Sequence, residues 1–325
     1  MKKVAVIYGG KSTEHEISIK SAQFVLKNID RTKYDVVEIY IDSNGDWDVD
    51  QLKGVDVAFP VLHGLYGEDG TIQGTLEMME IPYVGCHVLA SAVCMDKVYA
   101  KLIFDHCGIR NAKSVYVQYI EDNNYAYYNE RMEVKNIDDE ELNFLVSGKL
   151  KFPVFVKPSN SGSSIGVERV EELEDVVKAV KDAAKFDKKV LIEEGIIGKE
   201  VEVAVCGNAR IGVEVSRVGE IMSAETFYSY AAKYENAASR TVVPADLTEE
   251  QTEEIRRIAE KAYIAVDGDG LSRCDFFVQA GSGKVFMNEI NTLPGLTNIS
   301  MWPILMRDLG YEDSKIIDKL IEMVE

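Results

Sequence analysis

The sequence predicts a chain of mixed α/β and α+β class, in which an open parallel sheet is followed by antiparallel hairpins. Over roughly the first 90 residues, short apolar runs alternate with stretches of helical spacing, as in an open parallel sheet. Further along, two apolar segments flank a Gly/Ser-rich loop at 153–170, and this order predicts a hairpin. Two more segments, 272–279 and 284–291, are separated only by the turn AGSG and also predict antiparallel pairing.

The N-terminal segment begins with the apolar run VAVIY (4–8), which ends at a pair of glycines and is typical of a buried parallel strand. Residues 15–29 then carry apolar side chains at helical spacing, with Ser12 or Thr13 as the candidate N-cap. The other strands predicted in this segment are 35–41, 56–62 and 81–84.

The rest of the chain has a different composition. Residues 119–141 are rich in tyrosine, asparagine and acidic side chains, and we expect a solvated excursion that carries no chemistry. A polar stretch at 219–247 has little periodicity, and loops of this length are usually functional or disordered. Thr248 and Gln251 are spaced as a capping box for a following helix. The other elements predicted here are helices at 92–106, 171–186 and 314–323 and strands at 189–194, 200–206 and 209–216.

The composition indicates a globular protein and excludes several classes. The 36 basic and 55 acidic side chains give a net charge of −19, whereas a nucleic-acid-binding face needs an excess of Lys and Arg. No apolar stretch approaches the ~20 residues of a membrane span, and the apolar run near the N-terminus is too short for a signal peptide. The five cysteines include no CxxC pair and are expected to be reduced core thiols. We therefore expect a cytoplasmic protein of two or three modules that binds neither nucleic acid nor membrane.

Four polar side chains on the last two predicted strands form the strongest chemical signal. Residues two apart on a strand share a face, so Arg273 lies beside Asp275 and Glu289 lies beside Asn291. Paired across a hairpin, they gather three oxygen-bearing side chains and one guanidinium. Mg²⁺ prefers oxygen ligands and bridges carboxylates to substrate phosphates, so this cluster is a candidate metal site. The alternative is a ladder of charges without function, since opposite charges across strands are mildly stabilising.

A second signal is the loop KPSNSGSSIG (157–166), which offers a line of backbone N–H groups and hydroxyls suited to an anion. Lys157 adds a positive charge at the end of the preceding strand. The order of strand, loop and strand differs from the strand, loop and helix of a P-loop. A flexible hairpin tip without function is the alternative.

Two single residues are weaker signals. His63 follows an apolar strand, and ligands of open α/β sheets bind beyond the carboxyl ends of the strands. A lone histidine is, however, more often structural. Glu16 lies at the start of the first predicted helix, where it would either bind an ammonium group or simply favour the helix dipole.

Together and in this order, the motifs resemble the ATP-grasp superfamily and, within it, the D-alanine–D-alanine ligase family. The resemblance covers nearly the whole chain. It implies an N-terminal α/β substrate domain at 1–94, a central ATP-grasp domain at 95–186 and a C-terminal ATP-grasp domain at 187–325, with a mobile loop at 225–244. The matching strings are GGKSTEHEIS (9–18), VLHGLYGEDGTIQG (61–74), MDK (95–97), VKPSNSGSSIGV (156–167), FYSYAAKY (227–234), SRCDFF (272–277) and NEINTLPGLTNISMWP (288–303).

The resemblance also implies a role for each candidate residue. At the first D-alanine it implies Glu16 and His63, with Ser163 and Tyr234 hydrogen-bonded to Glu16. At the carboxylate of the second D-alanine it implies Ser300 and Met301, and at the oxyanion Arg273 and the backbone N–H of Gly295. For ATP it implies Lys97, Lys157 and Ser164 near the phosphates, Lys233 at the transferred phosphate, and Glu193, Ile196 and Glu200 around adenine and ribose. The implied ligands of two Mg²⁺ ions, which Mn²⁺ could replace, are Asp275, Glu289 and Asn291.

The implied reaction has two steps and yields D-alanyl-D-alanine for peptidoglycan precursor synthesis. The carboxylate of the first D-alanine attacks the γ-phosphorus of ATP, and the amine of the second D-alanine then attacks the acyl phosphate. A D-alanine–D-serine ligase of the vancomycin-resistance type is the alternative, because one added hydroxyl is a small difference; Tyr234 argues against a lactate-forming enzyme. A nucleotide-binding regulator without turnover would lack some metal or oxyanion positions, and all are present. By family analogy we expect a homodimer.

Overall fold

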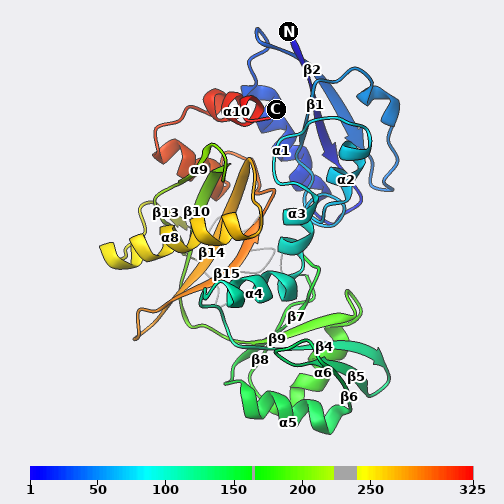
Figure 1. Ribbon diagram of the computed structural model, residues 1–325, viewed down its shortest axis with the longest axis vertical. Coiled ribbons are helices and arrows are strands. Elements are labelled where there is room, and N and C mark those ends of the chain that lie inside the picture. The colour runs from blue at the N-terminus through cyan, green and yellow to red at the C-terminus, as the bar shows by residue number, and fades with distance from the viewer. Residues whose placement is uncertain (163–164, 223–239, 325) are drawn as a thin grey trace.

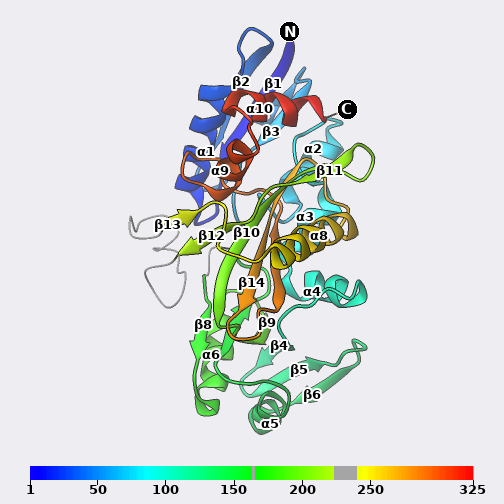
Figure 2. The same ribbon diagram turned by 90° about the vertical axis from the view of Figure 1, so that its left-hand side faces the viewer.

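Within the described part of the chain, three sheets follow one another along the long axis of the molecule, in an order that differs from their order in the chain. The computed structural model describes residues 1–162, 165–222 and 240–324. The N-terminal sheet lies at one end, the sheet formed by residues 114–194 at the other, and the C-terminal sheet between them (Figure 1 and Figure 2).

The N-terminal sheet has three parallel strands in the order β2-β1-β3, which confirms the predicted open parallel sheet. The central strand is buried on both faces: Val4 and Val6 belong to one apolar cluster, and Ala5 and Ile7 to another. The elements of this module are β1 (Lys2–Gly9), α1 (His15–Asn28), β2 (Tyr34–Ile41), the 3₁₀ helix η1 (Val49–Leu52), β3 (Val57–Pro60), α2 (Thr71–Met78) and α3 (Val88–Met95).

An antiparallel sheet in the order β6-β5-β4-β9-β7-β8 forms the opposite end of the molecule, and two helices, α5 and α6, cover one of its faces (Figure 1). The elements are α4 (Lys97–His106), β4 (Ser114–Glu121), β5 (Asn124–Tyr128), β6 (Val134–Ile137), α5 (Asp139–Lys149), β7 (Val154–Pro158), β8 (Glu168–Val170), η2 (Leu173–Asp175), α6 (Val176–Ala183) and β9 (Lys189–Glu194). β7 and β8 form the predicted hairpin around the Gly/Ser loop. β9 belongs to this sheet although it follows the boundary expected at residue 186.

The prediction of a solvated excursion at 119–141 is wrong. β5 and β6 pair within this segment, and β4 extends into it. Tyr125 and Ile137 lie opposite one another across these strands and are 0% and 3% exposed. Tyrosine side chains thus form much of the buried face of these strands. The many acidic residues of the segment made it resemble an exposed loop in the sequence.

The C-terminal sheet carries most of the candidate site residues. Its order is β13-β12-β10-β14-β15, with β11 paired to β10. The predicted capping box at the start of α8 is confirmed, because the side chains of Thr248 and Gln251 each accept a hydrogen bond from the backbone N–H of the other. The elements are β10 (Gly198–Asn208), β11 (Gly212–Val215), β12 (Gly219–Met222), β13 (Arg240–Val242), α8 (Glu249–Ala265), β14 (Leu271–Gln279), β15 (Val285–Asn291), α9 (Met301–Asp308) and α10 (Asp313–Glu322).

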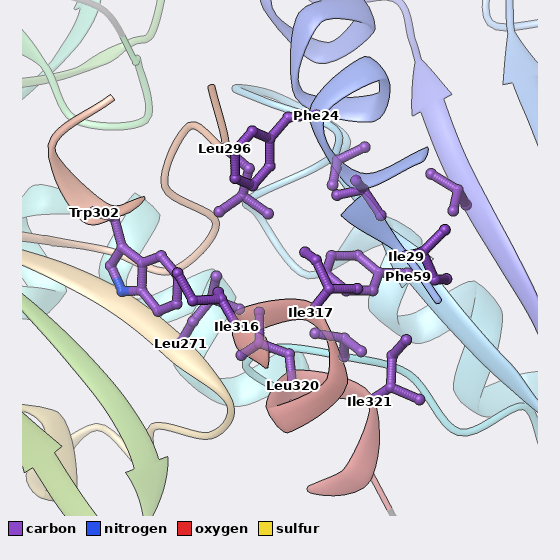
Figure 3. Packing of buried hydrophobic residues seen from close by; sticks show 14 of the residues in the cluster. Phe24, Ile29, Phe59, Leu271, Leu296, Trp302, Ile316, Ile317, Leu320 and Ile321 are labelled. Atoms are coloured by element: carbon purple, nitrogen blue, oxygen red, sulfur yellow. The ribbon is translucent and has the colours of Figure 1, made fainter. Parts of the chain in front are cut away.

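An apolar cluster joins the N-terminal sheet to the C-terminal sheet (Figure 3). It combines Phe24 of α1 and Phe59 of β3 with Trp302 of α9, Leu271 of β14 and Ile317 of α10. Burying a large apolar side chain contributes about 1.5–3 kcal/mol. The packing therefore fixes the loops at the carboxyl ends of β1 and β3 against the segment that follows β15.

The described residues bear on two further expectations, which concern membrane-spanning helices and the state of the cysteines. None of their helices combines the length and the apolar character needed to cross a bilayer. All five cysteines are free, and four of them are buried. Burial raises the pKa of the Cys274 thiol well above its ordinary value, so this cysteine is an inert core residue although Arg273 and Asp275 flank it in sequence.

Candidate active site

A polar cavity lies where the three modules meet. It is bordered by the loop after β3, by the Gly/Ser loop, by β14 and β15, and by the segment between β15 and α9. Among the predicted site residues, those that border it are His63, Lys97, Arg273, Glu289, Asn291, Gly295, Ser300 and Met301.

The structure places Glu14 rather than Glu16 at this cavity. α1 begins at His15, so Glu14 occupies the N-cap position, and its side chain is buried (5% exposed). Its Oε2 atom lies 2.7 Å from the position that a Cβ atom would take at Gly64 and 2.9 Å from the one at Gly162. Glu16 lies on the exposed face of α1. The structure thus brings Glu14, and not Glu16, to the cavity.

His63 borders the cavity, but hydrogen bonds engage both of its ring nitrogens. Nδ1 donates to the carbonyl oxygen of Leu293 (3.0 Å) and lies 3.4 Å from a carboxylate oxygen of Glu68, while Nε2 lies 2.8 Å from the hydroxyl of Ser21. Burial disfavours the charged imidazole, but the Glu68 carboxylate outweighs this effect and raises the pKa of His63. His63 thus ties the N-terminal module to the segment that follows β15.

The polar residues of β14 and β15 lie on one face of the sheet. The register pairs Arg273 with Asn291 and Asp275 with Glu289, which confirms the predicted juxtaposition. The Arg273 guanidinium donates two hydrogen bonds to Asp275, from Nε to Oδ1 and from Nη2 to Oδ2, each 2.7 Å long. It also forms an ion pair with Glu202 of β10, with 3.1 Å between Nε and Oε2. Glu202 could not be predicted from the sequence, because β10 becomes a neighbour of β14 only in the folded chain.

The oxygen-bearing side chains of this face fit a divalent cation that arrives with a phosphate. In the part of the chain that the structure describes, no three His, Cys, Asp or Glu side chains form a ready-made metal cage. Mg²⁺ usually takes one or two protein carboxylates and completes its shell from phosphates and water, so a sparse site suits it. Glu289 is partly exposed and borders the cavity, where its Oε2 atom lies 4.0 Å from Nζ of Lys97. Asp275 and Asn291 lie beside it on the same face.

Glu193 lies in a buried cluster with two lysines. Its Oε1 atom accepts a hydrogen bond from Lys157, and its Oε2 atom lies 3.0 Å from Nζ of Lys101. Burial by itself would raise the pKa of Glu193, but the two lysines outweigh it and lower the pKa to about 2. Burial likewise opposes the charge of Lys157, and Glu193 raises the pKa of that lysine. The cluster therefore holds Lys157 in its charged form. Lys101 was missed, although it follows Lys97 by one helical turn.

Lys97 fixes one side of the Gly/Ser loop. Its ammonium group donates a 2.6 Å hydrogen bond to the carbonyl oxygen of Ser161. The preceding residue, Asp96, accepts a hydrogen bond from the hydroxyl of Ser159 (2.5 Å). Asn160 donates to Asp187 (2.9 Å). The first part of the predicted anion-binding loop is therefore anchored by charged side chains.

The remaining predicted residues occupy two regions. Ile196 is half-buried in the connection between β9 and β10, and Glu200 lies on β10 opposite Phe277 of β14. Gly295 and Ser300 border the cavity, and a Cβ atom at Gly295 would lie 3.0 Å from the hydroxyl oxygen of Ser300. Met301, also at the cavity, begins α9.

Four predicted residues, Ser163, Ser164, Lys233 and Tyr234, lie outside the described residues. The same is true of most of the loop expected at 225–244. Its residues 240–242 are described, and they form β13, which pairs with β12.

The fold and the cavity together define the class of protein. A Gly/Ser hairpin on one antiparallel sheet, with Lys157 on β7 and Lys97 on α4 beside it, faces paired carboxylates on another sheet, which is the arrangement of an ATP-grasp enzyme. The family follows from comparison with known proteins. The model of the D-ala D-ala ligase N-terminus matches residues 3–53 and 48–86, and that of the D-ala D-ala ligase C-terminus matches residues 120–322. The chain belongs to the D-alanine–D-alanine ligase family.

Individual relatives support this membership over the full length. The D-alanine–D-alanine ligases of Clostridium acetobutylicum and Acetivibrio thermocellus are each 43% identical to this chain, over 99% of it and over 97% and 95% of their own lengths. Among solved structures, the VanG D-Ala:D-Ser ligase from Enterococcus faecalis is 36% identical with a TM-score of 0.84, covering 99% of both chains. The D-alanine–D-alanine ligase from Coxiella burnetii is 31% identical with a TM-score of 0.83, covering 99% of this chain and 93% of that one. These similarities confirm the predicted ATP-grasp fold.

Proposed function

We propose that this protein uses ATP to join two D-alanine molecules into D-alanyl-D-alanine, for the synthesis of peptidoglycan precursors. The observation that carries the proposal is one cavity that brings Glu14, from the start of the chain, together with Arg273, Glu289 and Ser300, from near its end. These side chains offer, in turn, an acceptor for an ammonium group, a donor for an oxyanion, a ligand for a metal ion and a donor for a carboxylate.

In the first step, Glu14 holds the ammonium of the first D-alanine while the carboxylate of that substrate attacks the γ-phosphorus of ATP. Phosphoryl transfer depends chiefly on positioning and on neutralising charge. Lys97 and Lys157 supply positive charge, and Lys157 is kept protonated by its buried partner. Mg²⁺, held by Asp275, Glu289 and Asn291 when bound, supplies further charge neutralisation at the phosphates. The products of this step are ADP and an acyl phosphate.

In the second step, the amine of the second D-alanine attacks the activated carbonyl, and phosphate leaves. Charge develops on the carbonyl oxygen, where the Arg273 guanidinium and the backbone N–H of Gly295 serve as donors. A donor of this kind typically contributes about 3 kcal/mol. Ser300 receives the carboxylate of the second substrate, and its hydroxyl is oriented by Thr297, whose Oγ1 atom lies 2.7 Å away. Met301 lies next to it.

A second candidate function is the ligation of D-alanine to D-serine. It is favoured by the similarity to the VanG D-Ala:D-Ser ligase from Enterococcus faecalis. The wall that would contact the second side chain includes Met301, whose sulfur would lie 2.7 Å from a Cβ atom at Gly219. The Met301 side chain itself offers no strong hydrogen bond to a serine hydroxyl, so we prefer D-alanine as the second substrate.

The experiment that tests the proposal is analysis of the products formed with ATP, Mg²⁺ and D-alanine, alone and in competition with D-serine and D-lactate. We expect D-alanyl-D-alanine, ADP and phosphate. A predominance of D-alanyl-D-serine in the competition would favour the second candidate. Release of phosphate without any dipeptide or depsipeptide would contradict both.

Further assignments belong to the same proposal. We infer two Mg²⁺ ions, which Mn²⁺ can replace, a homodimer and a cytoplasmic location. We also propose that Ile196 and Glu200 contact adenine and ribose. Glu193 is less suited to this role, because both of its carboxylate oxygens are engaged by lysines. We propose the first domain boundary after residue 94 as expected, and we move the second from residue 186 to the end of β9 at residue 194, because β9 pairs with β4 and β7. Size-exclusion chromatography with light scattering tests the dimer.

A further inference from the structure

Glu202 is a buried carboxylate that lines the cavity and has no role in the mechanism described above. It is 7% exposed and lies on β10, directly opposite Asp275 of β14, which in turn lies opposite Glu289 of β15. Side chains directly opposite on neighbouring strands approach within about 4.5–5.5 Å at Cβ. Three carboxylates therefore form one row across the sheet, at the wall that also holds Ser300.

Arg273 lies between two of these carboxylates and contacts them unequally. Its Nε–H and Nη2–H both donate to Asp275 at 2.7 Å, in the bidentate geometry that suits a guanidinium and a carboxylate. Glu202 lies 3.1 Å from the same Nε atom, which is ion-pair distance, although the single Nε–H is directed to Asp275. Asp275 is thus the primary partner of Arg273, and Glu202 is a second anion within reach.

The two expected tasks of Asp275 conflict. A divalent cation on the Asp275 oxygens would draw on the same carboxylate charge and repel the nearby guanidinium, so it would weaken both hydrogen bonds from Arg273. The guanidinium cannot lose its charge, and leaving it buried without an anionic partner is strongly unfavourable. A replacement partner has to lie close enough to be reached by a small rotation of the same side chain. Glu202 meets this requirement.

We propose that Glu202 is a positioning residue that takes over the Arg273 guanidinium when Asp275 engages a divalent cation. The transfer frees Asp275 for the metal and keeps Arg273 at the oxyanion. This inference rests on the proposed function for the role of Arg273 in turnover, but the exchange of partners is a property of the side chains and can be measured without turnover. No bond to the substrate is required of Glu202.

The decisive experiment is a double-mutant cycle on metal binding. The affinity of the protein for Mn²⁺ in the presence of ADP is measured by electron paramagnetic resonance of free Mn²⁺, for the wild type, Glu202→Gln, Arg273→Ala and the double variant. Glu202→Gln should weaken Mn²⁺ binding by about tenfold, as expected for residues that orient metal ligands. In the Arg273→Ala background the same substitution should change the affinity less than about twofold, because nothing then competes for Asp275.

The cycle distinguishes partner exchange from a simple effect of charge. Losing one negative charge near the metal would weaken binding equally in both backgrounds, and that result would overturn the proposal. No weakening in either background would overturn it as well. Arg273→Gln replaces Arg273→Ala if the alanine variant does not fold, as judged by thermal unfolding.

A matched control comes from the other face of the same sheet. Glu220 of β12 lies opposite Val201, the neighbour of Glu202, and pairs with Lys199 at 3.0 Å. Glu220→Gln removes a carboxylate without touching Arg273 and should leave Mn²⁺ affinity unchanged.

Steady-state kinetics supply a second readout. In Glu202→Gln at saturating Mg²⁺, kcat should fall about tenfold while the KM for ATP stays within about twofold, because Glu202 positions Arg273 rather than the nucleotide. Glu202→Asp retains the charge and should recover part of the loss. Equal kcat for Glu202→Gln and the wild type would count against the role in turnover. If the wild type formed no dipeptide at all, the proposed function would fail while the binding cycle still tested the partner exchange.

Discussion

The carboxylate of Glu14 lies against the backbone of Gly162, with Oε2 only 2.9 Å from the position that a Cβ atom would occupy there. The two residues are distant in sequence and belong to different modules. Gly162 does not adopt a positive φ, so the glycine is needed for space rather than for backbone conformation. The contact joins the start of α1 to the Gly/Ser loop at the cavity.

We expect Gly162→Ala to displace the Glu14 carboxylate and to lower kcat/KM for the first D-alanine by about tenfold, since small misplacements of positioning groups are costly. Kinetics at varied D-alanine and saturating ATP would check this. Gly148→Ala is the matched control, because nothing lies within 4 Å of a Cβ atom there, and its kinetics should match the wild type. Unchanged kinetics for Gly162→Ala would show that the close approach is not needed.

Glu14 borders the cavity and Glu16 is exposed, so a direct comparison of the two carboxylates tests which of them binds the first substrate. Glu14→Gln should lower kcat/KM for D-alanine by at least about 30-fold, as for loss of a buried charge that pairs with a ligand. Glu16→Gln should leave it within about twofold, because a substitution on an exposed helix face is usually neutral. The reverse ranking would restore the interpretation drawn from the sequence.

The sequence contained enough information to choose between these two residues. Glu16, Lys20, Gln23 and Lys27 recur at helical spacing and are all exposed in the structure. A polar stripe of this kind predicts the solvent face of α1. Glu14 precedes the helix, so the same periodicity does not assign it to that face.

Other features differed in how far local sequence could reveal them. The face shared by Asp275 and Glu289 could be predicted, because side chains alternate between the two faces of a strand and a short turn joins the two strands. Both features can be seen in a short stretch of sequence. Glu202 and Lys101 contact their partners across elements that are far apart in the sequence. The sequence does not show which of these elements become neighbours in the fold. Similarly, the tyrosine-lined strands at 124–137 were missed, because composition alone does not reveal which face of a segment is buried.

Glu289→Gln tests the metal site directly. The amide keeps the shape of the side chain but loses the charge that a divalent cation requires, so kcat should fall more than about 100-fold, beyond the usual effect of outer-sphere residues. Turnover would be followed as phosphate release over a range of Mg²⁺ concentrations. Glu254→Gln, on α8 beside Arg110, is the control and should behave as the wild type. Turnover of Glu289→Gln within a few-fold of the wild type at ordinary Mg²⁺ would argue against a ligand at this position.

The pair of His63 and Glu68 predicts a pH dependence of stability. The pKa of His63 is raised in the folded protein, so its stabilising contribution is complete below the unfolded pKa and is lost as pH rises through the folded pKa. In Glu68→Gln the main raising cause is removed, so only Glu14 and the Leu293 carbonyl oppose burial, and the pKa of His63 should be lower than in the wild type. The free energy of unfolding, measured in urea from about pH 6 to about pH 9, should therefore fall less steeply with pH in the variant, by up to about 1.4 kcal/mol per pH unit. Parallel curves for the two proteins would contradict this assignment.

The cluster of Glu193 with Lys157 and Lys101 predicts a large loss of stability in Glu193→Gln. Both carboxylate oxygens are used by lysines, and removing one partner of a buried ion pair costs about 3–5 kcal/mol, because the other charges stay buried. Glu194→Gln is the matched control, since its carboxylate accepts a solvent-exposed hydrogen bond from the backbone of Lys151, and it should cost about 1 kcal/mol or less.

The same cluster predicts how the free energy of unfolding of the wild type changes under acid conditions. The pKa of Glu193 is lowered to about 2, so its contribution is complete above the ordinary glutamate pKa and is lost as pH falls through that value toward about 2. Urea unfolding at neutral pH and under acid conditions would therefore show wild type and Glu193→Gln converging as pH falls. A loss below about 1 kcal/mol at neutral pH would mean that the two lysines find other partners or lose their protons when Glu193 is neutralised.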